Sequence, residues 1–320
     1  MPLILQRNQA LEIYKETANR KWVLPTFNAE NLNTIEAILS AVKNYGEKVG
    51  IEDLPIIIGI TNNYSHRPQS VYYTNTRCWQ IGMKLFLSDI AVLTGQDSPF
   101  SKLRVMIHLD HIQWDADKEL LEWDMNLFSS IMYDASTLPL NQNIEKTTEF
   151  VEKHKSKIII EGACDEILSE NSKKNDLTSP DDAEEYYNRT GVDIVVANLG
   201  TEHRASKLEL KYRADLAQSI QNRIGARLCL HGTSSVSTEK LATLFKDGIC
   251  KVNIWTILER ESLHALFREM IMNVGKIIGQ ERSGKMIKDG LLGEKTDFLS
   301  YQSIEYFTSK YRQEIVFQRM

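Results

Sequence analysis

The segment LRVMIHLDH, residues 103–111, is apolar along most of its length and ends in two ionisable side chains. A short apolar run of this kind is typical of a strand that is buried on both faces of a parallel sheet. Seven further runs share this character: WVLPTFN (22–28), LPIIIGIT (54–61), LFSSIMYD (127–134), KIIIEGA (157–163), VDIVVANLG (192–200), ARLCLHG (226–232) and ICKVNIWT (249–256). The chain therefore predicts eight buried strands.

Helical patterns lie between these strands. Apolar residues are spaced three and four apart within residues 31–48, which predicts an amphipathic helix. Similar patterns cover residues 141–155, 182–188, 237–248 and 258–279, and Ser237 is a suitable N-cap. Eight strands that alternate with helices predict an α/β fold, the (β/α)8 TIM barrel. A doubly wound open sheet is the alternative, but no GxGxxG follows the first strand. Residues 62–78 form either a long loop or the start of a helix.

The composition is that of an ordinary globular protein. The 320 residues carry a net charge of -5, with 42% apolar and 25% charged residues, which excludes a disordered chain and disfavours general nucleic-acid binding. No linker-like stretch interrupts the sequence, so we expect one domain over 1–320, with a C-terminal helical extension at about 280–320. We find no membrane span or secretory signal, and the four cysteines are scattered. A cytoplasmic protein with reduced thiols is expected.

Polar side chains collect where the predicted strands end. A TIM barrel brings the carboxyl ends of its strands to one mouth, where active sites form. The residues at these ends are Asn28, Thr61, Asp110, His111, Asp134, Glu161, His203, His231 and Asn253. Three histidines with one open position are a typical catalytic zinc site, so we predict His111, His203 and His231 as ligands. Asp134 and Glu161 either orient these histidines or bind loop amides.

His108 precedes His111 by three residues in the same strand. The two side chains should therefore lie on opposite faces of the strand, with Asp110 on the side of His108. We predict His108 to be a hydrogen-bonded core histidine. At the end of the strand, the twist and the turn can still bring Asp110 into the mouth.

Several motifs, in order, resemble the class II, zinc-dependent fructose-bisphosphate aldolase family. The similarity runs from about residue 10 to residue 260. It is carried by these segments: VLPTFNAENLNTIEAILSAV (23–42), MIHLDH (106–111), FSSIMYDASTLPLNQNIEKT (128–147), NLGTEHRASK (198–207), LCLHGTSS (228–235) and GICKVNIWT (248–256).

The resemblance implies roles for individual residues. His111, His203 and His231 would bind one Zn²⁺ per chain, and Asp110 would exchange the proton during carbon–carbon bond cleavage or formation. Gly200, Gly232, Ser234 and Thr256 would cradle a phosphate, beside which the family often has a monovalent cation. Lys207 matches a lysine of the sixth loop, and Asn253 would contact substrate near the reacting carbon. The family also implies a homodimer or homotetramer, and a loop around Lys173 and Lys174 that could close over the site.

The sequence departs from the family around the substrate. Arg204 replaces a glycine after a predicted ligand and is either an anion contact or a solvated loop residue. Trp255 replaces an aspartate that contacts substrate in the family, and the segment after Glu161 lacks a second glutamate. Two glycines are missing from the loop after His231.

We therefore expect a zinc-dependent aldolase-type lyase, an aldehyde-lyase acting next to a ketose carbonyl. Its substrate would be a phosphorylated or acidic sugar other than fructose 1,6-bisphosphate, with Asn28, Thr61, Arg204 and Trp255 also in the substrate shell. A metal-dependent sugar isomerase or epimerase is one alternative. The other is a catalytically silent barrel that binds a sugar phosphate or a protein partner.

Overall fold

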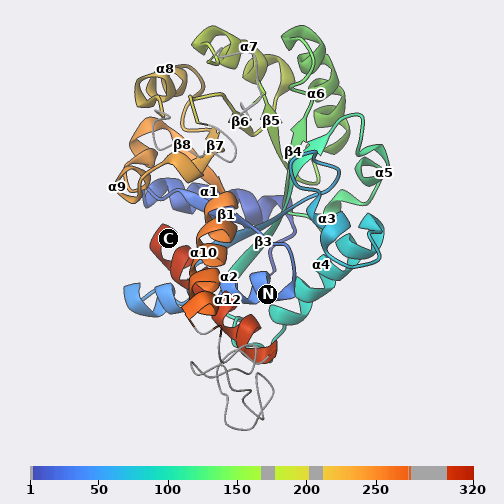
Figure 1. Ribbon diagram of the computed structural model, residues 1–320. Coiled ribbons are helices and arrows are strands. Elements are labelled where there is room, and N and C mark those ends of the chain that lie inside the picture. Colours follow the sequence, from blue (N-terminus) through green and yellow to red (C-terminus); the bar gives the residue numbers. More distant parts are fainter. Residues whose placement is uncertain (1–2, 167–176, 202–211, 273, 275–300) are drawn as a thin grey trace, which may run out of the picture.

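Eight parallel strands close into a barrel in the computed structural model, which describes residues 3–166, 177–201, 212–272, 274 and 301–320 (Figure 1). The strands are β1 (Leu24–Asn28), β2 (Pro55–Thr61), β3 (Arg104–Gln113), β4 (Ser130–Asp134), β5 (Ile159–Ala163), β6 (Ile194–Val196), β7 (Leu228–Leu230) and β8 (Ile249–Ile254). Each strand pairs with the next along the chain, and β1 pairs with β8, with Thr26 opposite Asn253. The predicted TIM barrel is confirmed.

Helices surround the barrel as the alternating pattern predicts (Figure 1). They are α1 (Arg7–Asn19), α2 (Leu32–Val49), α3 (Gln69–Tyr72), α4 (Trp79–Leu93), α5 (Lys118–Leu121), α6 (Leu140–His154), α7 (Pro180–Thr190), α8 (Ala214–Ile224), α9 (Thr238–Leu241), α10 (Thr256–Met272) and α12 (Tyr301–Arg319). Short 3-10 turns η1 (Met125–Leu127), η2 (Thr233–Ser235) and η3 (Leu244–Asp247) complete the described elements. Among the described residues, no helix is both long and apolar enough to cross a membrane.

One local prediction needs correction, and one open alternative is decided by the structure. The helix predicted over residues 237–248 is two short pieces, α9 and η3, although Ser237 is the N-cap and accepts a hydrogen bond from the Lys240 amide. The Thr243 hydroxyl donates to the carbonyl of Lys240 between the pieces, a local bond that competes with continued helix. The undecided stretch at 62–78 is a loop that contains only the short helix α3.

The sequence patterns do not predict α1, which lies across the amino-terminal end of the barrel. Ala10 and Ile13 of α1 pack against residues from strand beginnings such as Leu24 and Ile159. Arg7 also donates to both carboxylate oxygens of Asp193, at 2.7 and 2.6 Å. The helix closes this end with apolar contacts, so the carboxyl-terminal mouth is where the chain places its polar side chains.

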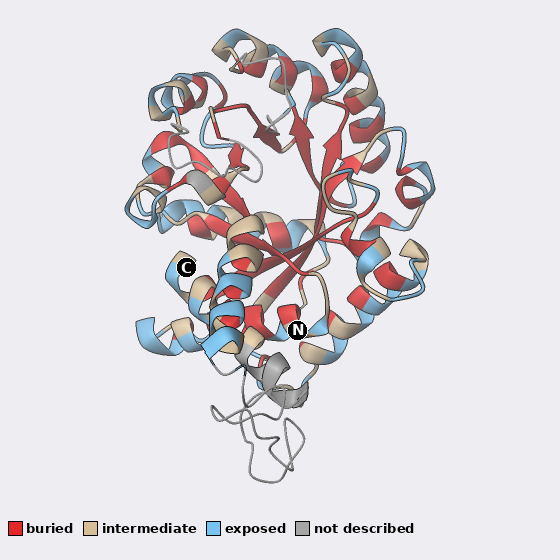
Figure 2. Cartoon of the chain, in the orientation of Figure 1, coloured by how far each residue is buried: buried red, intermediate tan, exposed pale blue. Residues whose placement is uncertain are grey.

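The strands are buried on both faces (Figure 2). One apolar cluster fills the space between strands and helices, and a second fills the part of the barrel interior next to α1. Between the second cluster and the carboxyl-terminal mouth, the barrel interior becomes polar. His108, Glu161 and Lys251 all have side chains that are fully buried there. Buried polar groups of this kind need partners, and those partners define the site.

Candidate active site

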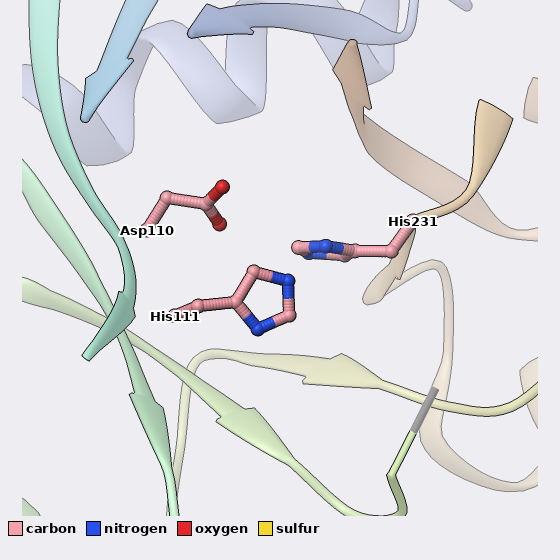
Figure 3. Close-up of side chains that lie close together, drawn as sticks. All are labelled: Asp110, His111 and His231. Atoms are coloured by element: carbon pink, nitrogen blue, oxygen red, sulfur yellow. The ribbon is translucent and has the colours of Figure 1, made fainter. Parts of the chain in front are cut away.

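A bulge in β3 brings two consecutive residues to the mouth of the barrel. The register between β3 and β4 shifts between Leu109 and Ile112, and His111 adopts a left-handed backbone conformation with φ of 50°. In a regular strand Asp110 and His111 would point to opposite faces. The bulge turns the His111 ring toward Asp110 and His231 (Figure 3), which the alternation rule did not predict.

Two amides hold the carboxylate of Asp110. Nδ2 of Asn28, from β1, donates to Oδ2 at 2.7 Å, and Nδ2 of Asn253, from β8, donates to Oδ1 at 2.8 Å. Burial by itself raises the pKa of Asp110, but the neighbouring His111, His108 and His231 hold it well below its ordinary value. The side chain is therefore an oriented carboxylate, and each oxygen keeps a lone pair for a further proton.

His111 and His231 lie next to Asp110 (Figure 3). The two rings meet edge to face, with centroids 4.9 Å apart. One ligand atom from each of Asp110, His111 and His231 falls within a group whose members are all within 4.8 Å of one another. The spacing suits a single metal ion that draws these atoms in. The His231 backbone is fixed by Thr201, whose hydroxyl donates to its carbonyl at 2.7 Å.

The mouth holds a small cavity, open to solvent, between the ends of β1, β2, β3, β7 and β8. Ten of the predicted site residues line it: Asn28, Thr61, Asp110, His111, His231, Gly232, Ser234, Asn253, Trp255 and Thr256. Gly200 follows β6 and is not part of this lining. His203, Arg204, Lys207 and the loop with Lys173 and Lys174 lie outside the described residues.

The two predicted orienting carboxylates lie at different depths. Asp134 lies beside the mouth, with Oδ2 at 3.1 Å from Nδ1 of His111. Glu161 is deeper and fully buried, and its Oε1 is 2.7 Å from Nζ of Lys251. His108 is also fully buried, and its Nδ1 is 2.8 Å from the Ser130 hydroxyl. This hydrogen bond agrees with the prediction of a core histidine.

Loop residues 62–69 contribute side chains that the sequence analysis missed. Gln69 is buried, and its Oε1 accepts from the Thr61 amide at 2.9 Å and from Nδ2 of Asn28 at 3.3 Å. The Tyr64 ring stacks on the His111 ring, with centroids 4.2 Å apart and an angle of 5°. The polar and aromatic composition of the loop was the available signal, but it does not indicate which side chains turn inward.

Trp255 takes part in a contact at the rim. Its Nε1 donates to Oε1 of Glu30 at 2.9 Å, and Arg67 donates to both oxygens of the same carboxylate. The three residues lie in the segments that follow β1, β2 and β8. The positive charge of Arg67 is thus directed to Glu30, and the indole N–H is engaged.

The fold and site define a class of protein: a TIM barrel whose mouth combines a carboxylate with histidines suited to one metal ion. The model of the class II fructose-bisphosphate aldolase family matches residues 8–309, so the chain belongs to this family of aldolase-type lyases.

Solved structures agree on the fold. The structure of fructose-bisphosphate aldolase from Campylobacter jejuni is similar with a TM-score of 0.74 and 17% identity, covering 98% of this chain and 93% of that one. The YdjI aldolase from Escherichia coli gives a TM-score of 0.68 and 19% identity, covering 96% of this chain and 93% of that one. At these identities the likeness shows the barrel fold alone.

Proposed function

We propose that this protein is a zinc-dependent aldolase-type lyase for a phosphorylated or acidic sugar other than fructose 1,6-bisphosphate. Membership of the family supports the reaction class. The observation that carries the proposal is the group formed by Asp110, His111 and His231 at the barrel mouth. It combines a base that can move a proton with donors for a divalent metal.

The residues present fit Zn²⁺. Imidazole nitrogens are its usual protein ligands, and Nδ1 of His111 is engaged with Asp134, which leaves Nε2 as the ligand atom. His203 would complete the ligand set with His231. When bound, Zn²⁺ would supply the positive charge that stabilises the enediolate formed next to a ketose carbonyl.

Asp110 would carry the proton. Cleavage requires a base that takes the proton from the hydroxyl on the carbon that becomes the aldehyde, and addition returns it. The Asn28 and Asn253 amides keep the carboxylate charged and fix its direction. In this arrangement the base needs little reorganisation when substrate binds.

Trp255 and Glu30 support a change of substrate. An indole has one donor and no acceptor, whereas the aspartate expected here by resemblance accepts hydrogen bonds from sugar hydroxyls. That single donor is bonded to Glu30. Gly232, Ser234 and Thr256 still line the cavity, where backbone amides and hydroxyls would bind a phosphate or carboxylate.

Metal content per chain tests the proposal most directly. Wild type should retain about one zinc after dialysis, and His203→Ala and His231→Ala should lose both the zinc and turnover. His264, an exposed residue of α10, provides the control variant His264→Ala, which should behave like wild type. A wild type that holds no zinc when zinc is supplied, or an active His203→Ala, would contradict the proposal.

Substrate identity requires a second experiment. Zinc-loaded protein would be incubated with dihydroxyacetone phosphate or dihydroxyacetone and a panel of aldehydes, and the products analysed by NMR. We expect carbon–carbon bond formation with some pairs and little cleavage of fructose 1,6-bisphosphate. Interconversion of single sugars without a change in chain length would indicate an isomerase or epimerase instead.

We also propose that the chain forms a homo-oligomer. Leu263, Phe267 and Ile271 on α10 are 59%, 60% and 56% exposed, and they follow one another at intervals of four residues. An exposed apolar stripe of this kind commonly marks an interface. Light scattering should give a mass above that of one chain, and Phe267→Lys with Ile271→Lys should lower it. A monomeric wild type would overturn this part of the proposal.

A further inference from the structure

A buried ion pair lies directly beneath the site. Lys251 and Glu161 have fully buried side chains, and Nζ of Lys251 is 2.7 Å from Oε1 of Glu161. Burial lowers the pKa of Lys251, but Cys229, Glu161 and Asp110 raise it by more, so the side chain stays an ammonium. A buried pair of this kind contributes little net stability compared with apolar residues of the same size. Its presence therefore calls for a different physical role.

The ammonium of Lys251 determines which way the Asn253 amide faces. Nζ donates to Oδ1 of Asn253. An ammonium has donors and no acceptor, so the amide must turn its oxygen toward Lys251 and its nitrogen away. That nitrogen, Nδ2, then donates to Oδ1 of Asp110 at 2.8 Å. A flipped amide would place an oxygen against the carboxylate and repel it.

The remaining neighbours keep the ammonium in place. Nε2 of His108 is 3.4 Å from Nζ, and Sγ of Cys229 is 3.7 Å from it. Glu161, Cys229 and His231 have donor atoms close enough to hold a metal ion, but the Lys251 ammonium already lies against two of these residues. The cluster therefore surrounds a cation that belongs to the chain.

We propose that Lys251, held by Glu161, is a positioning residue that orients Asp110 through the Asn253 amide. The inference rests on the proposed function for the role of Asp110. It adds a chain of contacts, from Glu161 to Lys251, Asn253 and Asp110, that runs from the barrel interior to the base. Lys251 itself does not contact the substrate in this proposal.

The test removes both charges together, because a single substitution would leave an unpaired buried charge. Glu161→Gln with Lys251→Met is compared with Asn253→Leu and with the triple variant. Aldol addition of dihydroxyacetone phosphate, and separately of dihydroxyacetone, to an acceptor aldehyde is followed by NMR, because this reaction includes the hydroxyl-proton transfer assigned to Asp110. We expect kcat to fall about 10- to 100-fold in the double variant, with KM changed less than about threefold. The triple variant should be no slower than Asn253→Leu.

A matched control is the Lys240–Asp247 pair, with Nζ 2.9 Å from Oδ2, near the start of β8 at the opposite end of the barrel. Lys240→Met with Asp247→Asn should leave kcat at the wild-type value, whatever it does to thermal unfolding. A kcat of Glu161→Gln, Lys251→Met equal to wild type would overturn the proposal. So would a triple variant in which the two losses multiply, because Lys251 would then act independently of Asn253.

A crystal structure of the double variant separates this inference from the proposed function. We expect Nδ2 of Asn253 to leave hydrogen-bond distance of Asp110 Oδ1. An unchanged amide contact would overturn the positioning role even if wild type is active. A wild type that adds neither ketone to any aldehyde of the panel would overturn the proposed function, while the amide geometry would still decide the role of Lys251.

Discussion

Asp134 and His111 are joined across neighbouring strands, with Oδ2 of the carboxylate 3.1 Å from Nδ1 of the ring. Gln113 donates to the same oxygen at 3.0 Å, and Ser136 donates to the other. Burial raises the pKa of Asp134, but His111 and Ser136 lower it by more, so the group is a carboxylate. A carboxylate in this position fixes the tautomer and direction of a metal-binding histidine.

Asp134→Ala should weaken zinc binding about 10- to 100-fold, because the His111 ring loses the partner that orients it. Competition with a chelating dye measures the affinity. Asp115→Ala, at an exposed position four residues after His111, should leave it unchanged. Equal affinities for Asp134→Ala and wild type would show that the ring is held by other contacts.

Gly59→Ala, on β2, should displace Asn28 on the neighbouring strand β1. A Cβ there would lie 2.4 Å from Oδ1 of Asn28 and 3.1 Å from Cγ2 of Thr26, so Asn28 must move away from Asp110. We expect a loss of about 1–3 kcal/mol in the free energy of unfolding and a lower kcat. Chemical denaturation and the aldol-addition assay measure the two effects. Gly95→Ala, whose nearest contact is 3.2 Å away, should keep its kcat, and a fully active Gly59→Ala would contradict this account of Asn28.

Trp255→Phe should alter substrate preference while leaving zinc content unchanged. The substitution keeps an aromatic ring but removes the donor to Glu30, which loosens one of the contacts at the rim. One such hydrogen bond contributes about 1 kcal/mol, so kcat/KM should change roughly fivefold for the preferred acceptor aldehyde. Kinetics across the aldehyde panel provide the measurement. Trp22→Phe, just before β1 at the other end of the barrel, is the control and should have no effect. If Trp255→Phe keeps the kcat/KM values of wild type and of Trp22→Phe, Trp255 does not determine substrate preference.

Glu16→Gln should lower stability near pH 7 and have little effect in acid. Hydrogen bonds from Arg104 lower the pKa of Glu16 from its ordinary value of 4.5. The stability contributed by this carboxylate is therefore present above pH 4.5 and is lost as the pH falls through the lower folded-state pKa. Because the pair is partly exposed, we expect at most about 1 kcal/mol, measured by urea unfolding. Glu12→Gln in an exposed pair should change less, and a pH-independent loss for Glu16→Gln would contradict the assignment.

The sequence predicts the barrel because a strand that is buried on both faces is a short run of mostly apolar residues. Strands such as 54–61 and 157–163 are apolar almost throughout, and the structure places β2 and β5 within those limits. The strand predicted over 192–200 is reduced to β6, because residues after Val196 leave the ladder to form the mouth. The order of the strands also predicts that the strand ends carrying Asp110, His111 and His231 share one mouth of the barrel.

Other parts of the site depend on contacts that no pattern contains. The direction of His111 depends on the bulge and its left-handed backbone, which reverse the alternation expected from a regular strand. Gln69 and Arg67 belong to a loop whose composition does not say which side chains face inward. In the sequence, Lys251 is a single charged residue within a strand. Only the structure shows that Glu161, from β5, lies beside it in the barrel interior.

The sequence by itself determined the eight buried strands, the family and most of the strand-end residues that line the mouth. These features follow from local apolar patterns and from strand ends that any parallel barrel brings together. Only the tertiary structure decided how those residues are held: Asp110 by Asn28 and Asn253, and Asn253 by Lys251. The physical reason is that hydrogen-bond direction depends on partners far apart in the chain, whose placement exists only once the barrel has closed.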